Sequence, residues 1–575
     1  MKRIYLLKIS FLFFILVSSC EQNHELTKRD SESENSFNQY APEDAFSEDP
    51  KYPYYGSESK WNRGAFSENA AKNSYKRKSQ RQLLEVLDGN FDEAIKICQS
   101  DLKDDPNDLE SLFILTIAYC QNGQIADAFN TAILAIEKGM PIERYLTGPR
   151  ELLQPLYHNI NFQKIIKNKN INILHGPLLG AVTDSSAKIW FRTTKESKIK
   201  IEVYENDITE KPLQIVESKS FAENDYTIVL SINGLKQNTT YLYNVFIDNN
   251  VELKQKVFTT FSSGKSKKNI RIAFGGGAGY TPKYEKIWNT INEREPNSLL
   301  LLGDNVYIDL PTFPNAFHDY TYYRRQSSKY FRELVDNVPT FSIWDDHDAA
   351  INDVWLGPYI DKPNWKLPML KHFERNWNNP SYGTKDAPGC FYKFSISDVD
   401  FFMMDCRFYR TNPFKEGQTM IGPIQKEWLK SSILESKAKF KVIVSSVPWS
   451  EGAKPGSHDT WDGYANEREE IFQFIEENKI DGIILLSADR HRSDAWKIER
   501  NNGYDLYEFT SSKLTNMHTH KLMPNSLFGY NEKCSFGELD FNFENDNPKV
   551  TYNIINIDGD LINSVTVTLN QLSYK

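Results

Sequence analysis

Residues 298–309 read Ser-Leu-Leu-Leu-Leu-Gly-Asp-Asn-Val-Tyr-Ile-Asp, an apolar run that ends abruptly in polar and charged residues. The four leucines at 299–302 predict a strand that is buried on both faces. Gly303 permits a sharp exit from that strand, which sets Asp304 at its tip and Tyr307 three residues further on. A single stretch of this kind is common, so its surroundings decide what it means.

Strands and helices alternate on either side of this stretch. Near-continuous apolar runs and helical patterns follow one another through residues 268–575, at Ile270–Phe274, Tyr284–Asn292, Ser298–Leu302, Phe341–Trp344, Val399–Met404, Lys441–Ser445, Glu469–Glu477 and Gly482–Ser487. The alternation predicts a layered α/β core, in which polar residues gather beyond the carboxyl ends of the strands.

Two further apolar runs end in ionisable residues. Residues 341–344 precede Asp345-Asp346-His347-Asp348, and residues 483–486 precede Ser487-Ala488-Asp489-Arg490-His491. Adjacent carboxylates repel one another and are costly to bury without a counter-ion, so a bound metal is the simplest explanation. Acids that bridge two metal ions suit the hydrolysis of phosphoric esters. A tyrosine phenolate is a hard ligand that favours Fe³⁺.

Seven motifs, in this order and spacing, resemble the alkaline phosphatase D family of calcineurin-like metallophosphoesterases. They are GDNVYID (303–309), SIWDDHDAAIND (342–353), MMDCRFYR (403–410), IGPIQKEWL (421–429), DTWDGYANERE (459–469), SADRH (487–491) and YEFTSSKLTN (507–516). The resemblance implies a four-layer α/β/β/α metallophosphoesterase core and an enzyme that hydrolyses phosphoric monoesters or diesters. It also implies two metal ions, Fe³⁺ with Ca²⁺, Zn²⁺ or Mn²⁺.

The resemblance further implies roles for single residues. His347 resembles the acid that protonates the leaving oxygen, and Arg407 is either a phosphate clamp or the partner of Asp405 in a salt bridge. Asn352, with Asp353, lies one helical turn beyond the second strand end and is expected beside the substrate, as a ligand or as a helix cap. The implied metal ligands are Asp304, Tyr307, Asp346, Asp489 and His491.

One motif departs from the family pattern. The family's first strand ends in metal-binding residues, whereas here Phe274 is followed by Gly-Gly-Gly-Ala-Gly at 275–279. These glycines either bring backbone N–H groups to a phosphate or form a tight turn. Residues 445–449, Ser-Ser-Val-Pro-Trp, also lack the histidine that related enzymes often place there. The alternative function is therefore a non-catalytic or substrate-restricted binding protein on a decayed phosphatase core.

Two modules precede the core. Residues 170–263 show period-two alternation and predict an antiparallel β-sandwich, and Gly234–Tyr243 resembles a corner of fibronectin type III modules. In residues 81–168, Gly89–Ala94 recurs 34 residues later as Gly123–Ala128, which resembles the tetratricopeptide repeat. A plain helical hairpin is the alternative. Such a segment predicts packing or a protein partner rather than chemistry.

The chain begins with the pattern of an export signal. Basic residues precede an apolar run at 9–17, which ends in Val17-Ser18-Ser19-Cys20. A cysteine after small residues resembles a bacterial lipobox, so Cys20 is predicted to carry a lipid anchor in the periplasm or at the cell surface. An ordinary cleaved signal is the alternative. Residues 21–80, rich in Ser, Glu, Asn and Lys, predict a disordered tether.

Composition narrows the choice of partners. The 575 residues include 68 Lys and Arg against 77 Asp and Glu, which gives a net charge of −9. Basic residues are not in excess, so the composition does not indicate a nucleic-acid partner. The five cysteines after Cys20 form no CxxC pairs, and separate buried thiols are expected.

Overall fold

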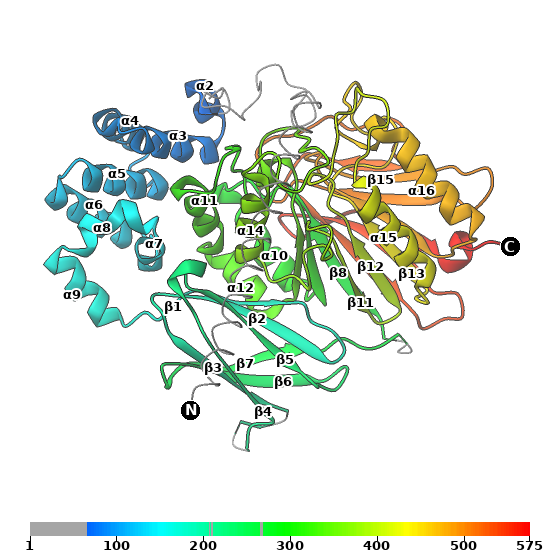
Figure 1. Ribbon diagram of the computed structural model, residues 1–575, viewed down its shortest axis with the longest axis horizontal. Coiled ribbons are helices and arrows are strands. Elements are labelled where there is room, and N and C mark those ends of the chain that lie inside the picture. Colours follow the sequence, from blue (N-terminus) through cyan, green and yellow to red (C-terminus); the bar gives the residue numbers. More distant parts are fainter. Residues whose placement is uncertain (1–65, 206, 209–210, 265–267) are drawn as a thin grey trace, which may run out of the picture.

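The computed structural model describes residues 66–575 except 206, 209–210 and 265–267. The predicted signal peptide, Cys20 and residues 21–65 of the predicted tether lie outside these residues. None of the helices described is long and apolar enough to cross a membrane. Three parts follow one another along the chain, namely a helical segment, a β-sandwich and a large α/β core (Figure 1).

The helical segment is built from short helices that pack side by side. Its central helix α5 contacts α4, α6 and α8. Ala118, Ala128 and Ala132 are fully buried, and their small side chains let the helix backbones approach closely. The helices are α2 (Glu68–Asn73), α3 (Tyr75–Leu87), α4 (Phe91–Asp104), α5 (Leu109–Gln121), α6 (Ile125–Glu137), α7 (Ile142–Thr147), α8 (Arg150–Tyr157) and α9 (Ile160–Lys169).

Helical structure begins earlier than the sequence predicts. The expected tether reaches residue 80, yet α2 begins at Glu68 and α3 covers residues 75–87. The polar composition was misleading because the first half of α3 buries polar side chains against the core, and its apolar residues come only at its end. Lys76, Arg77 and Gln80 are at most 8% exposed.

The sandwich consists of a three-stranded and a four-stranded antiparallel sheet, in the orders β1-β2-β5 and β4-β3-β6-β7. Alternate residues of β6 are buried, as period-two patterning requires. Arg192 ties the sandwich to the core, because its Nη2 donates to Asn376 Oδ1 at 2.8 Å. The strands are β1 (Ile173–Gly180), β2 (Ser186–Thr193), β3 (Lys198–Tyr204), β4 (Gln214–Lys219), β5 (Thr227–Asn233), β6 (Thr240–Ile247) and β7 (Asn250–Thr259).

The core contains two mixed sheets. The six-stranded sheet has the order β10-β9-β8-β18-β19-β20, and the seven-stranded sheet has the order β11-β12-β13-β14-β16-β15-β17. The first comprises β8 (Ile270–Gly275), β9 (Ser298–Leu302), β10 (Thr340–Ile343), β18 (Ser535–Asn542), β19 (Lys549–Asn556) and β20 (Leu561–Thr568). The second comprises β11 (Tyr392–Ile396), β12 (Val399–Met403), β13 (Phe440–Val444), β14 (Ile483–Ser487), β15 (Ser493–Ile498), β16 (Leu506–Ser511) and β17 (Phe528–Tyr530).

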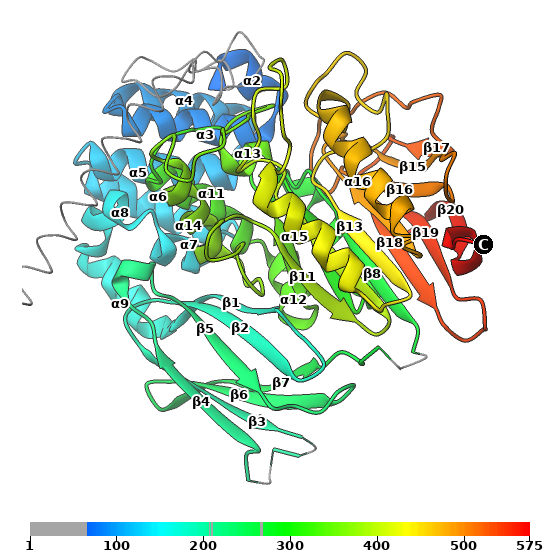
Figure 2. The ribbon, with the colours of Figure 1, turned by 45° about the vertical axis from the view of Figure 1, so that its right-hand side comes forward.

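Aromatic side chains join the two sheets, and helices flank them. The rings of Phe509 and Tyr552 stack with centroids 4.6 Å apart. Helices α15 (Gly422–Glu435) and α16 (Ala465–Glu477) cover the seven-stranded sheet (Figure 2). Arg294, which follows α10 (Ile287–Glu293), donates to Glu538 of β18 at 2.9 Å and so holds that helix at the six-stranded sheet. The other core helices are α11 (Ala316–Gln326), α12 (Lys329–Asn337), α13 (Asp346–Ala349) and α14 (Lys366–Asn376).

The helical segment docks on the core through α11. Glu110 is buried between the two parts and accepts hydrogen bonds from Tyr320 at 2.6 Å and from Arg144 at 3.1 Å. The Phe113 and Tyr320 rings stack beside this group. The five cysteines in the described residues are all buried and free, as predicted.

Candidate active site

The three strand ends that the sequence singles out meet at one edge of the core. Strands β9 and β10 are parallel neighbours, so Asp304 and Asp346 leave their sheet on the same side. Asp489 and His491 follow β14 of the facing sheet. Tyr307 connects the two sheets, since its hydroxyl donates to Asp304 Oδ2 at 2.8 Å and lies 3.1 Å from His491 Nε2.

The backbone at these strand ends is strained. Asp304, Asp489 and His491 have φ angles of 53°, 62° and 45°, in the left-handed region that non-glycine residues rarely adopt. Each such residue costs about 1–3 kcal/mol and persists where the surrounding structure enforces it, as at functional sites.

Several buried polar atoms here lack a hydrogen-bond partner among the described residues. Asp304 Oδ1, Asp345 Oδ2 and His491 Nδ1 make no hydrogen bond to any described residue. Buried polar atoms are normally satisfied, so these atoms need a ligand. The donors are carboxylate, phenol and imidazole, which fit hard and borderline metal ions. Within the part of the chain that the structure describes, potential ligand atoms that lie within 4.8 Å of one another form three groups: Asp304, Asp346 and His347; Asp346, Asp353 and Asp459; and His491, His518 and His520.

The charges of the site also favour a cation. Burial raises the pKa of Asp304, and nearby carboxylates add to this effect. Burial likewise raises the pKa of Asp346 to about 6, because the repulsion from Asp304 and Asp459 adds to it and Arg407 compensates only in part. A bound cation would keep both groups ionised.

His347 is held by a carboxylate that the sequence did not single out. Its Nδ1 lies 2.5 Å from Asp309 Oδ1, and Arg77 Nη2 of α3 lies 2.5 Å from Asp309 Oδ2. Burial disfavours the charged imidazole, but Asp309, with Asp346 and Asp304, outweighs burial and raises the pKa of His347 to about 10. Asp309 thus occupies Nδ1, and no hydrogen bond joins Nε2 to another of the described residues.

Arg407 is not a free phosphate clamp. Its Nε donates to Asp345 Oδ1 at 2.5 Å and its Nη1 to Asp459 Oδ1 at 2.6 Å, and the side chain is fully buried. Among the described residues, the guanidinium forms no salt bridge with Asp405, which was the other predicted role. Asp405 instead accepts the backbone N–H of Arg407 at 2.9 Å. Arg407 therefore holds the second strand end in place.

The two remaining predicted residues, Asn352 and Asp353, lie in the turn after α13. Asn352 is half-buried there, and Asp353 pairs with Lys454 at 2.7 Å. The backbone N–H of Asp353 donates to Asp346 Oδ2 at 2.7 Å, so this turn supports a predicted ligand. Asp348 has a structural task, since its carboxylate accepts the backbone N–H groups of Asp345, Asn305 and Val306.

The glycine-rich loop after β8 is a tight turn. The backbone N–H groups of Gly276, Gly277 and Ala278 donate to carbonyl oxygens of the neighbouring strand ends, so they offer nothing to a phosphate. A Cβ on Gly276 would lie 2.7 Å from Ala488 Cβ, which explains the absence of a side chain. The close approach of β8 to the β14 end requires glycine here.

The sequence assigned no role to several residues of the site. Asn516 ends the last motif, and its Nδ2 donates to the Tyr307 hydroxyl at 2.5 Å. Lys76, Arg77 and Gln80 come from α3, where the sequence predicts no chemistry. Their involvement follows only from the docking of the helical segment, which no local pattern reveals. His518 and His520 likewise sit on a loop that no motif marks.

Comparisons with known proteins show which families the chain resembles. The family model described as PhoD-like phosphatase matches residues 272–568, and one described as a domain of unknown function, DUF7800, matches residues 170–263. Alkaline phosphatase D of Bacillus subtilis (strain 168) is 21% identical over 341 residues, which is 50% of this chain and 56% of that protein. The match thus spans just over half the length of the curated relative.

Two solved structures share the fold. A structure of PhoD aligns with a TM-score of 0.58 and 16% identity, over 70% of this chain and 90% of the other. The purple acid phosphatase PPD1 of yellow lupin (Lupinus luteus) seeds aligns with a TM-score of 0.51 and 11% identity, over 69% and 75%. Because the family model covers more than half of its residues, this chain belongs to the PhoD-like phosphatase family, a family of phosphoric ester hydrolases.

Proposed function

We propose that this chain is a metal-dependent hydrolase of phosphoric esters. The observation that carries the proposal is the meeting of three strand ends around Asp304, whose Oδ1 is buried without a partner. Asp304, Tyr307, Asp346, Asp489 and His491 would hold two metal ions, Fe³⁺ with Ca²⁺, Zn²⁺ or Mn²⁺. Bound metal ions would activate a water molecule and neutralise charge on the phosphoryl oxygens.

The chain's own residues supply the proton chemistry and the positioning. Asp309 fixes the His347 ring through Nδ1, so Nε2 is the atom that gives a proton to the leaving oxygen. Arg407 holds the strand end that carries Asp346 through Asp345 and Asp459. Asn516 and Asp304 together fix the Tyr307 hydroxyl between the two sheets.

The test is hydrolysis of p-nitrophenyl phosphate and bis(p-nitrophenyl) phosphate by the full chain, with each metal added in turn. We expect activity, about two metal ions per chain by elemental analysis, and loss of activity on chelation that metal restores. Asp304→Asn should lose at least 10³-fold in kcat and part of the metal. Asp558→Asn, a surface carboxylate, is the control. Metal-free protein with no activity after metal addition would contradict the proposal.

The binding-only alternative is not proposed. Its main support was the bare loop after β8, and that loop is required by close packing. The strand ends that carry the proposed metal ligands lie together at one edge of the core.

We further propose that the enzyme is exported and anchored through a lipid on Cys20, in the periplasm or at the cell surface. The support is the basic start, the apolar run and the small residues before Cys20. Metabolic labelling with a radioactive fatty acid should mark the wild type and not Cys20→Ser. Equal labelling of both would contradict an anchor on this residue.

The two upstream modules are proposed to be tetratricopeptide-like and fibronectin III-like, with the helical segment free to bind a protein partner on the face turned away from α11. The 34-residue repeat supports the first assignment and the antiparallel strand pattern the second. Crosslinking on intact cells, with a photoreactive residue at exposed Leu134 of α6, should capture a partner. Capture equal to that from exposed Leu561 of the core would argue against a docking face.

A further inference from the structure

Helix α3 inserts a buried ammonium group into the candidate active site. Lys76 is 7% exposed, and its Nζ lies 2.9 Å from the centroid of the Tyr307 ring. The His347 ring lies against the same tyrosine, with centroids 4.4 Å apart. The amine therefore lies against the ring of a predicted metal ligand, which the predicted proton donor also contacts.

This ammonium group has no carboxylate partner among the described residues. The acids whose charge reaches it, Asp309 and Asp304, are already bound by Arg77 and by the Tyr307 hydroxyl. Buried charges are normally paired, so this position lacks an anion. Contact with a tyrosine ring stabilises a cation only in part.

The glycine-rich loop makes room for Lys76. A Cβ on Gly279 would lie 3.1 Å from Lys76 Nζ and 3.3 Å from Asn516 Cγ. The loop follows the first strand of the core, where the family resemblance leads us to expect metal-binding side chains. In this chain Lys76, from the helical segment, lies beside that loop instead.

We propose that Lys76 is a phosphate-binding residue of the active site, which pairs with a phosphoryl oxygen and favours dianionic phosphoric monoesters over monoanionic diesters. The proposal rests on the proposed function, since it assumes that phosphoric esters enter this site. A phosphoryl oxygen supplies the partner that the buried ammonium lacks, in a charge-assisted hydrogen bond. A monoester carries a second negative charge near neutral pH, and a diester does not.

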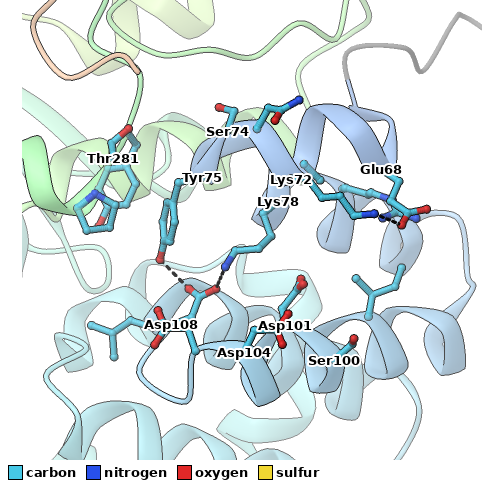
Figure 3. Close-up of a pocket in the computed structure, with 18 of the residues that line it drawn as sticks. Glu68, Lys72, Ser74, Tyr75, Lys78, Ser100, Asp101, Asp104, Asp108 and Thr281 are labelled. Carbon is cyan, nitrogen blue, oxygen red and sulfur yellow. Dashed lines mark hydrogen bonds and ion pairs between the residues drawn. The ribbon is translucent and has the colours of Figure 1, made fainter. Parts of the chain in front are cut away.

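The other side of α3 provides a matched control. Tyr75 and Lys78 both reach Asp108 across a cavity of about 930 Å³ between α3, α4 and residues 280–283 (Figure 3). Lys78 lies on the same helix as Lys76, two residues away, and has its own carboxylate partner, Asp108. Its loss removes one positive charge from α3 without touching Tyr307.

The experiment compares the full chain with Lys76→Met, Lys76→Arg and Lys78→Met. We measure kcat/KM for p-nitrophenyl phosphate and bis(p-nitrophenyl) phosphate, the Kd for inorganic phosphate by calorimetry, metal content and Tm. Lys76→Met should lose about 100-fold in kcat/KM on the monoester and less than about threefold on the diester, and bind phosphate at least tenfold more weakly. Metal content should be unchanged. Lys76→Arg should retain most of the monoester activity, and Lys78→Met should match the wild type.

Two results would overturn the proposal. One is equal phosphate affinity in the wild type and Lys76→Met. The other is a gain of metal or of activity in Lys76→Met, which would make the lysine a plug in a metal position. If the wild type hydrolyses neither ester, the proposed function fails, while the phosphate titration still tests Lys76. If Lys76→Met does not fold, Lys76→Gln takes its place, with the same outcomes.

Discussion

Asp309 Oδ1 lies 2.5 Å from His347 Nδ1, although the two residues belong to different strand ends. Asp309 follows β9 and His347 follows β10, and Arg77 of α3 takes the other carboxylate oxygen. The imidazole is thus fixed by a carboxylate that is itself fixed by the helical segment. The arrangement occupies Nδ1 and leaves Nε2 for the proposed transfer of a proton.

Substitution of His347 should depend on the leaving group. General acid catalysis contributes about 10²–10⁴-fold, and poor leaving groups need the proton most. In His347→Ala we expect kcat to fall at least tenfold more for phenyl phosphate than for p-nitrophenyl phosphate. Asp309→Asn should show the same trend more weakly. Equal losses on both esters would argue that His347 does not protonate the leaving oxygen.

Arg407→Met should affect stability before it affects substrate affinity. The substitution leaves Asp345 and Asp459 buried with a missing partner, and breaking a buried ion pair costs about 3–5 kcal/mol. Urea denaturation measures this loss. Lys96→Met, which breaks an exposed pair with Glu93, should change the free energy of unfolding by less than about 0.5 kcal/mol. A stable Arg407→Met with only a raised KM would restore the phosphate-clamp role.

Gly303→Ala should displace the second strand end. Gly303 has φ of 97°, and a Cβ there would lie 2.4 Å from Asp345 Cβ. We expect loss of most activity together with a stability loss of more than about 2 kcal/mol, since strain and overpacking add. Gly89→Ala, with φ of 81° and open space, isolates the backbone cost of about 1–2 kcal/mol. Similar effects at both positions would contradict the steric argument.

His318 should make stability depend on pH. Burial lowers its pKa from 6.5 to about 4 in the folded protein. Below pH 6.5 the unfolded chain binds a proton that the folded chain refuses, so stability falls from pH 6.5 towards pH 4. The free-energy advantage of the wild type over His318→Gln should therefore shrink by up to about 3 kcal/mol over this range. His158→Gln, at an exposed position, should show no such change. A constant difference would refute the burial effect.

The sequence predicted the core and its strand ends well because both depend on local signals. Leu299–Leu302 could be read as a buried strand, and the acids directly after it could be placed at a sheet edge. The ion pair of Arg407 with Asp459 could not be predicted, since the two residues are 52 positions apart in the sequence. The contacts of α3 with the site could not be predicted either, because they also join distant residues. In addition, the sequence of a polar helix is the same whether the helix faces solvent or packs against a polar site.

The position of α3 also concerns the order in which the protein can fold. Arg77 meets Asp309 across 232 residues of chain, and Gln80 meets Tyr307 across 227. Contacts of such separation form slowly, because the chain between them must first be ordered. During synthesis α3 emerges long before Asp309, Tyr307 and Asn516 exist. The helix must wait for its own binding surface, so the site is completed among the last steps of folding.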